Sequence, residues 1–180
     1  VLVKPESQTS SQVVLLGKPD HEISATDWRE RAPMLRAAVD NSLAALMAQH
    51  EIVVAEGAGS PAEINLYAVD LANMHVAREA DAAVLLVADI NRGGAFAHLY
   101  GTWALLPEAD RARIKGFILN RFRGDPALLA PGPEQLEELT GVPVLGVVPW
   151  LAHGLPDEDG VAAPSAPAPD GAPRIAIIRY

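Results

Sequence analysis

Carboxylate and glycine residues follow an apolar run early in this 180-residue sequence. Glu56 comes directly after residues 52–55, and Gly57 and Gly59 come next. A carboxylate after a buried strand can bind Mg²⁺, which takes only one or two protein carboxylates beside phosphate oxygens. Glycine lets a backbone approach a phosphate closely or simply makes a tight turn. We expect Glu56 to be a metal ligand; a solvated glutamate at a strand end is the alternative.

The next apolar run, residues 83–88, ends in a second polar turn. Asp89 and Arg92 lie in this turn, and Gly93 and Gly94 close it before a helical stretch. The first N–H groups of a helix are unpaired and form a ready anion site. An arginine beside them can bind a carboxylate or phosphate through two hydrogen bonds. A surface ion pair is the alternative for Arg92.

Two further apolar runs end in the same way. Asn120, Arg121 and Arg123 follow residues 116–119, and Pro149 ends the run at 142–148. In an open parallel sheet, ligands bind beyond the carboxyl ends of the strands. Asn120 alone could merely cap its turn, but four polar or glycine-rich turns together predict one site at this edge.

Helical stretches separate the four runs and must position these turns. The predicted helices cover residues 33–49, a segment capped by Asp70 that reaches about Ala80, residues 94–106 and residues 132–141, with Gly141 as C-terminal cap. Strands that alternate with helices predict an α/β fold with a parallel sheet and helices on both faces. The uninterrupted apolar runs are typical of strands buried on both faces.

Composition narrows the class of protein. With 49% hydrophobic residues and a net charge of −9, the chain has a globular composition and lacks the basic face that a nucleic-acid partner requires. No apolar run approaches the roughly 20 residues of a membrane helix. There is no cysteine, which excludes disulfides, zinc–thiolate sites and cysteine nucleophiles within these residues. A cytoplasmic location without a membrane partner is expected.

Both ends of the chain read as parts of something longer. Val1 lies inside an apolar run, and the closing RIAIIRY reads as a strand that begins another domain. A Pro/Ala/Gly tract poor in large side chains precedes it, which is typical of a linker. We expect a main domain at residues 1–158, a linker at 159–173 and the first strand of a truncated domain at 174–180.

Five stretches together resemble the cobyric acid synthase family: KPESQTSSQVVLLGKP, EGAGSPAEINL, ADINRGGAFAHLYGTWALLP, GFILNRFRGD and LEELTGVPVLGVVPWL. The likeness covers residues 1 to about 159. It implies a synthetase domain of the P-loop NTPase type, similar to dethiobiotin synthetase, without its N-terminal P-loop part. It also implies a carbon–nitrogen ligase of cobalamin biosynthesis. That enzyme amidates carboxylates of the corrinoid adenosylcobyrinic acid a,c-diamide through an acyl phosphate, using ATP and glutamine.

The resemblance assigns roles by position. It implies Glu56 as the Mg²⁺ ligand, Asn120 beside the adenine, and Pro149 with Gly57 and Gly59 around the nucleotide. On the side of the corrinoid or the acyl phosphate it implies Asp89 and Arg92 as catalytic residues, and Gly93 and Gly94 at the substrate. It implies that Ser7, Ser11 and Gln12 bind substrate from a loop and helix start. RIAIIRY would begin a fused class I glutaminase domain, the source of ammonia.

The chain departs from the family pattern in several places. Asn91 and Gln8 stand where the family has aspartates, so a metal or proton-transfer role is doubtful there, and Arg121 replaces a lysine. The 180 residues contain neither the phosphate-binding pattern G-x-x-x-x-G-K-S/T nor a glutaminase cysteine. We expect half a nucleotide site and no activity from these residues alone. The alternatives are a cobyrinic acid a,c-diamide synthase, a non-catalytic scaffold or a ParA/MinD-type ATPase relative.

Overall fold

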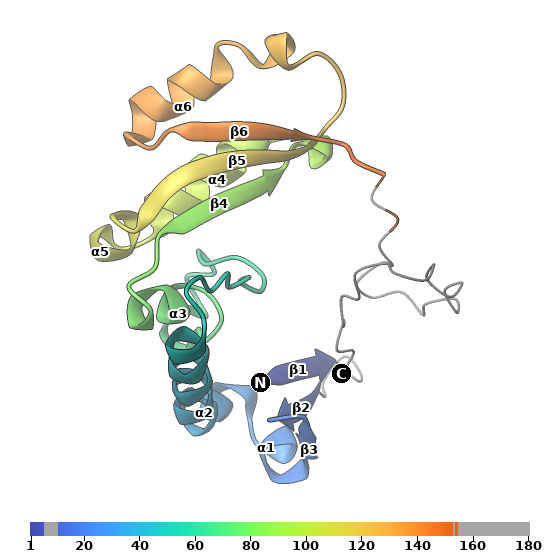
Figure 1. The fold of residues 1–180 in the computed structure, drawn as a ribbon, viewed down its shortest axis with the longest axis vertical. Coiled ribbons are helices and arrows are strands. Elements are labelled where there is room, and N and C mark those ends of the chain that lie inside the picture. Colours follow the sequence, from blue (N-terminus) through green and yellow to red (C-terminus); the bar gives the residue numbers. More distant parts are fainter. Residues whose placement is uncertain (6–10, 153, 155–180) are drawn as a thin grey trace. The chain divides into compact units, whose positions relative to one another are not determined.

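The computed structural model of the chain describes residues 1–5, 11–152 and 154 (Figure 1). Its contacts divide the chain into two compact units, Val1–Trp150 and Leu151–Tyr180. All described helices and strands belong to the first unit. Ser7, the predicted linker at 159–173 and the predicted strand at 174–180 lie outside the described residues, so these three predictions stay open.

The chain begins with a small antiparallel sheet of β1 (Leu2–Pro5), β2 (Ser11–Leu15) and β3 (Lys18–Asp20), in that order. Leu16 and Gly17, both with positive φ, make the tight turn from β2 to β3. The helix start expected near Ser11 and Gln12 is wrong, because both residues lie in β2. The pairing with β1 on one side and β3 on the other buries Val13 completely, and that burial favours the strand.

Two helices follow, and side-chain caps fix where they begin. Asp20 accepts a hydrogen bond from the backbone N–H of Ile23 and starts α1 (His21–Ala25). Asp27 accepts one from the N–H of Arg29 and starts α2 (Trp28–Gln49). The helix predicted at 33–49 is therefore confirmed but begins five residues earlier. Pro33 lies inside it and not in its first turn.

Residues 52–55 do not form the first predicted strand; this prediction is wrong. Ile52 and Val54 are 78% and 92% exposed, and no described strand pairs with this segment. A strand is stable only when a neighbour satisfies its backbone N–H and C=O groups, and apolar side chains alone do not supply that neighbour.

The segment after this run is short and held by side chains. It contains η1 (Tyr67–Val69) and α3 (Met74–Glu79). Oδ1 of Asp70 accepts hydrogen bonds from the N–H groups of Ala72 (3.1 Å) and Asn73 (3.0 Å). The predicted helix is thus confirmed at its end near Ala80, while Asp70 caps the turn that precedes the helix.

A three-stranded parallel sheet forms the main part of the described chain. Its strands are β4 (Val84–Asp89), β5 (Ile114–Phe122) and β6 (Val144–Pro149), in the order β4-β5-β6. Their arrows point the same way in Figure 1. The connections contain η2 (Ile90–Arg92), α4 (Ala95–Leu105), α5 (Glu108–Arg111), η3 (Pro126–Leu129) and α6 (Gly132–Thr140). Three of the four predicted strands and the α/β class are confirmed.

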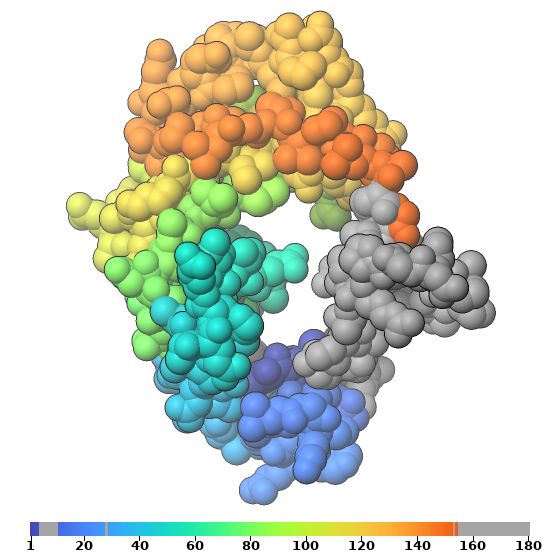
Figure 2. Space-filling view, viewed as in Figure 1, coloured from blue at the N-terminus to red at the C-terminus, as the bar shows by residue number. Residues whose placement is uncertain are grey.

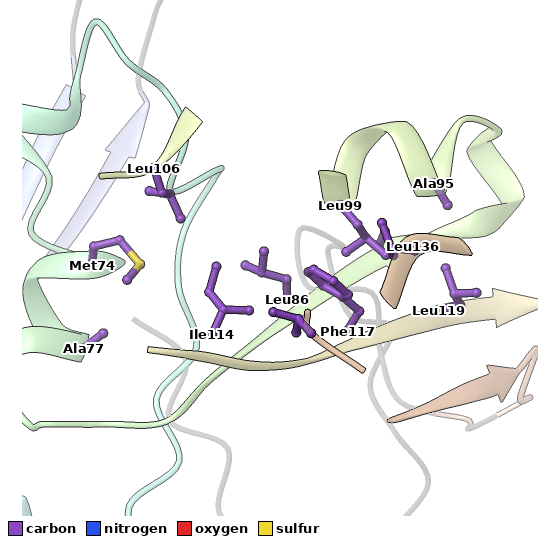
Figure 3. Packing of buried hydrophobic residues seen from close by; sticks show 12 residues of the cluster. Met74, Ala77, Leu86, Ala95, Leu99, Leu106, Ile114, Phe117, Leu119 and Leu136 are labelled. Atoms are coloured by element: carbon purple, nitrogen blue, oxygen red, sulfur yellow. The ribbon is translucent and has the colours of Figure 1, made fainter. Parts of the chain in front are cut away.

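The core of this unit lies between the sheet and the helices α4 and α6. Leu99 of α4 and Leu136 of α6 pack against Leu86, Phe117 and Leu119 of the strands (Figure 3). The packing of α6 against β6 can be followed by their orange colours in Figure 2. The opposite face of the sheet carries the exposed side chains of three residues: Leu85, Val87 and Leu145. None of the described helices has the length and apolar character needed to cross a bilayer.

A close approach between α4 and α6 gives a prediction about stability. A Cβ added at Gly132 would lie 2.6 Å from the Cζ atom of the Phe96 ring, whereas one added at Gly101 would meet nothing within 4 Å. We expect Gly132→Ala to lower the free energy of unfolding by about 1–3 kcal/mol, because the packed ring must move. Gly101→Ala is the matched control and should raise it by about 0.5–1 kcal/mol. Urea unfolding measures both; equal effects would contradict the close packing.

Candidate functional site

The carboxyl ends of the three parallel strands bring several of the predicted site residues to one edge of the sheet. Asp89 at the end of β4 pairs with Asn120 of β5, and Phe122 of β5 pairs with Pro149 at the end of β6. The parallel direction of the strands causes this juxtaposition, since each strand delivers its final residues to the same edge. We call this edge the carboxyl-end site.

Asp89 contacts three groups through its two carboxylate oxygens. Oδ1 accepts a hydrogen bond from the backbone N–H of Asn91 at 3.0 Å. Oδ2 lies 3.0 Å from Nη1 of Arg121 and 3.5 Å from Nε of Arg92. The Arg92 side chain is 77% exposed, so its ion pair is weak and water-screened. Arg92 can therefore turn toward an anionic ligand at little cost.

The turn after η2 suits an anion. Gly93 and Gly94 both have positive φ, 78° and 67°, which glycine adopts without strain. Gly94 is the N-cap of the eleven-residue helix α4, and no described side chain caps that helix. Its first N–H groups and the positive end of its dipole are thus open to a phosphate or carboxylate.

Arginine side chains cover an aromatic ring at the far end of the same edge. The guanidinium carbons of Arg121 and Arg123 lie 4.5 Å and 3.9 Å from the centre of the Trp150 ring. The backbone N–H of Trp150 donates to the carbonyl of Phe122 at 2.8 Å, and Oδ1 of Asn120 accepts from the N–H of Arg121. Sequence reasoning gave Arg121 and Arg123 only a general charge, and no local signal linked them to Trp150, which lies in a distant part of the sequence.

The predicted metal ligand lies in a separate loop. Glu56 is exposed, and no hydrogen bond or ion pair joins it to the carboxyl-end site within the described residues. The expected fourth strand end is not brought to the edge of the sheet, because residues 52–55 form no strand. Across the described parts of the chain, no three His, Cys, Asp or Glu side chains gather where they could hold a metal.

Asn73 holds the loop that follows Glu56. Its Nδ2 donates to the carbonyl of Ala58 at 2.9 Å and to Oδ1 of Asp70 at 3.1 Å. A Cβ added at Gly57 would lie 2.2 Å from Oδ1 of Asn73. Gly57 is therefore required for the close approach of the Asn73 amide, whether or not a ligand also approaches this glycine.

A double-mutant cycle tests this contact. Gly57→Ala should lower the free energy of unfolding by about 1–3 kcal/mol through the clash, and Asn73→Ala by about 1 kcal/mol through lost hydrogen bonds. The double variant should cost clearly less than the two together, since Asn73→Ala removes the atom that the new methyl group meets. Urea unfolding of the four proteins measures the coupling; additive costs would contradict the contact.

Two polar clusters that sequence reasoning missed lie away from the strand ends. In the first, the buried His75 is 2.6 Å from Oδ1 of Asp40 through Nε2 and 2.9 Å from Nη1 of Arg36 through Nδ1. Arginine only donates hydrogen bonds, so Nδ1 of His75 accepts and Nε2 donates to Asp40. This cluster joins α2 to α3 and gives His75 a structural role.

In the second cluster, the buried Asp110 of α5 accepts hydrogen bonds from two side chains. Tyr67 donates its hydroxyl to Oδ2, and Nη1 of Arg78 lies 3.0 Å from Oδ1 and 2.8 Å from Oδ2. Burial and the hydrogen bond and charge of Asp110 raise the pKa of Tyr67. Burial alone would lower the pKa of Arg78, but the hydrogen bond and charge of Asp110 outweigh it and raise that pKa.

Comparison with known proteins defines the class first. The family model described as "AAA domain" matches residues 4–155, most of the chain, so the chain belongs to that family. Its α/β fold with a parallel sheet agrees with this class. No solved structure matches the chain.

Several curated relatives that match the chain are cobyric acid synthases. The chain is 63% identical over 171 residues to the cobyric acid synthase of Deinococcus radiodurans. This match covers 94% of this chain and 36% of that relative. It is 54% identical to that of Variovorax paradoxus, covering 100% of this chain and 38% of the relative. It is 60% identical to the cobyric acid synthase of Methylibium petroleiphilum, and the match covers 89% of this chain and 32% of that relative. The resemblance seen in the motifs is thus confirmed. The chain spans about a third of the length of the curated relatives it matches.

Proposed function

We propose that this chain is part of the synthetase domain of an amidoligase of cobalamin biosynthesis, with the activity for which the cobyric acid synthases are named. The observation that carries the proposal is the identity of 54–63% with those enzymes over nearly the whole chain. The carboxyl-end site supports it, because three strand ends there present groups that can bind a base, a phosphate and a carboxylate.

The proposed reaction has two steps. A carboxylate of the corrinoid takes the terminal phosphoryl group of ATP, which leaves ADP and an acyl phosphate. Ammonia derived from glutamine by a fused glutaminase domain then attacks the acyl carbon, and phosphate leaves as the amide forms. Negative charge is present on the reacting groups both when the acyl phosphate forms and when ammonia attacks it. Cationic and N–H groups that stabilise this charge lower the barrier more than groups that bind the neutral amide product.

The residues of the carboxyl-end site divide between these tasks. Asn120, with Pro149, binds the base of the nucleotide, and the glycines of the loop at Gly57 and Gly59 approach its phosphates. Arg92 and the N-terminus of α4 at Gly93 and Gly94 hold the acyl phosphate or the corrinoid carboxylate. Asp89 keeps Arg92 near the turn. Ser7, Ser11 and Gln12 are proposed on the corrinoid side, and Ser11 already accepts a hydrogen bond from Nη1 of Arg31 at 2.5 Å.

Mg²⁺ is the proposed metal, and Glu56 is the residue that would hold it. An exposed carboxylate in a glycine-rich loop fits an ion that keeps most of its waters. When bound, Mg²⁺ would neutralise charge on the phosphates of ATP. Glu56→Gln should raise the Mg²⁺ concentration needed for half-maximal activity by at least about tenfold. The matched control is Glu63→Gln, another exposed glutamate of the same region; an equal effect there would contradict the assignment.

The function is tested on the intact protein that carries this chain. Purified protein is incubated with ATP, Mg²⁺ and adenosylcobyrinic acid a,c-diamide, with either glutamine or ammonium chloride as nitrogen source. Mass spectrometry follows the replacement of carboxylates by amides. We expect ATP-dependent amidation with both nitrogen sources, and none from the 180 residues alone.

The choice of nitrogen source and substrate separates the alternatives. Activity with ammonium chloride but not with glutamine would keep the synthetase and remove the glutaminase from the proposal. Amidation of cobyrinic acid in place of its a,c-diamide would indicate a cobyrinic acid a,c-diamide synthase. Absence of any ATP-dependent amide from either corrinoid, in a folded protein, would overturn the proposed function.

A further inference from the structure

The backbone of β5 has an irregular position at the carboxyl-end site. The pairing of β5 with β6 shifts between Leu119 and Phe122, where three steps along β5 match two along β6. Arg121 lies in this bulge with a φ of 64°. A left-handed conformation is uncommon for a residue other than glycine, and bulges beside active sites redirect side chains. Leu16 and Asp81 share this conformation, but in turns.

The side chain of Arg121 links the ends of the two outer strands of the sheet. Its Nη1 lies 3.0 Å from Oδ2 of Asp89, the last residue of β4, and its guanidinium carbon lies 4.5 Å from the ring centre of Trp150, directly after β6. In the strand order β4-β5-β6, β4 and β6 do not pair with each other. These contacts offset the cost of the left-handed backbone at Arg121, and the bulge directs the side chain toward both partners.

Charge in this cluster favours an anion. Arg92 and Arg121 contact the one carboxylate of Asp89, and Arg123 lies against the Trp150 ring that Arg121 also contacts, in a chain whose overall charge is −9. A guanidinium that contacts an indole keeps its charge and its outer N–H donors. The cluster therefore combines an aromatic ring, which can stack on a base, with excess positive charge, which can bind phosphates. A site for a nucleoside polyphosphate needs both properties.

We propose that Arg121 is a positioning residue for a purine nucleotide: it holds the indole of Trp150 and the carboxylate of Asp89 in place on either side of Asn120. The proposal rests on the proposed function for the identity of the nucleotide. It gives Asp89 the task of orienting Arg121 and Arg92, because both of its oxygens are already engaged.

The test uses the intact protein labelled with 5-fluorotryptophan. Fluorine NMR reports the surroundings of each indole, and Trp150→Phe identifies the Trp150 signal. Arg121→Lys keeps the charge beside Asp89 but cannot stack as a planar group, and Arg121→Gly relieves the backbone and removes the side chain. Mg-ATP and ADP are then titrated by calorimetry, and kcat and KM are measured with the corrinoid.

We expect the Trp150 signal of unliganded Arg121→Lys and Arg121→Gly protein to move toward that of free fluorotryptophan. The Kd for ATP should rise about tenfold, the scale of one lost base–aromatic contact, while kcat changes less than about threefold. Lysine should retain more affinity than glycine. The matched control is Arg111→Lys, which alters a second arginine–tryptophan pair, with Trp103 at 5.0 Å; it should move only the Trp103 signal and leave ATP binding unchanged.

Three results would overturn the proposal. An unchanged Trp150 signal in both Arg121 variants would show that Arg121 does not hold the ring. A shifted signal with unchanged ATP affinity would show that the ring is held for another purpose. A wild-type protein that binds neither ATP nor ADP would overturn the proposed function and the nucleotide together, whereas failure in the variants alone leaves the proposed function standing.

Discussion

Arg78→Met is expected to lower the free energy of unfolding by about 3–5 kcal/mol, because it leaves a buried carboxylate without its countercharge. Asp110 is only 1% exposed, and Arg78 contacts both of its oxygens. The hydroxyl of Tyr67 would be the one remaining donor to it among the described side chains. Urea unfolding, followed on the transition that includes this unit, measures the loss.

The matched control for this prediction is a surface ion pair of the same type. Arg113→Met breaks a contact of 2.7 Å with Asp81, whose side chain is 93% exposed. Water replaces that contact, so the loss should be about 0–1 kcal/mol. Equal losses in the two variants would show that the carboxylate of Asp110 becomes hydrated and that the buried pair has no special role.

Arg92→Ala should lower kcat by about 10²–10³-fold, as expected for the loss of one preorganised group that holds developing negative charge. The Kd for ATP should change less than about threefold, because the proposed partner of Arg92 is the acyl phosphate or the corrinoid. Among the residues that the structure describes, the Arg92 side chain forms an ion pair with Asp89, and this pair is weak. Steady-state kinetics and calorimetry on the intact protein measure the two quantities.

A conservative variant separates charge from geometry at this position. Arg92→Lys keeps the charge but cannot form the two-bond contact of a guanidinium with a phosphate or carboxylate, so it should recover only part of kcat. Equal losses of turnover and ATP affinity in Arg92→Ala would place Arg92 on the nucleotide. A full recovery by lysine would show that charge alone suffices.

Local signals in the sequence were sufficient for much of the parallel sheet and its helices. The apolar runs before Asp89, Asn120 and Pro149 became β4, β5 and β6, and glycine marked the start of α4 at Gly94 and the end of α6 at Gly141. Each of these features depends on neighbours within a few residues, or on the rule that alternating strands and helices make a parallel sheet.

Features that depend on a distant partner could not be read in this way. Residues 52–55 have the composition of a buried strand, yet they form none, because no described strand pairs with them. Ser11 and Gln12 became part of β2 through pairing with β1. The sequence pattern identifies a segment that can be a strand, and pairing decides whether it becomes one.

The sequence by itself determined the family, the α/β class and the residue types at the three strand ends, since motifs and hydrophobic runs are local. Only the tertiary structure decided which side chains contact one another. Asp110 meets Arg78 and Tyr67 across 32 and 43 residues, and Arg121 meets Asp89 across 32. Such contacts form because packing brings distant segments within a few ångströms, and a carboxylate that packing buries, such as that of Asp110, must find a partner there.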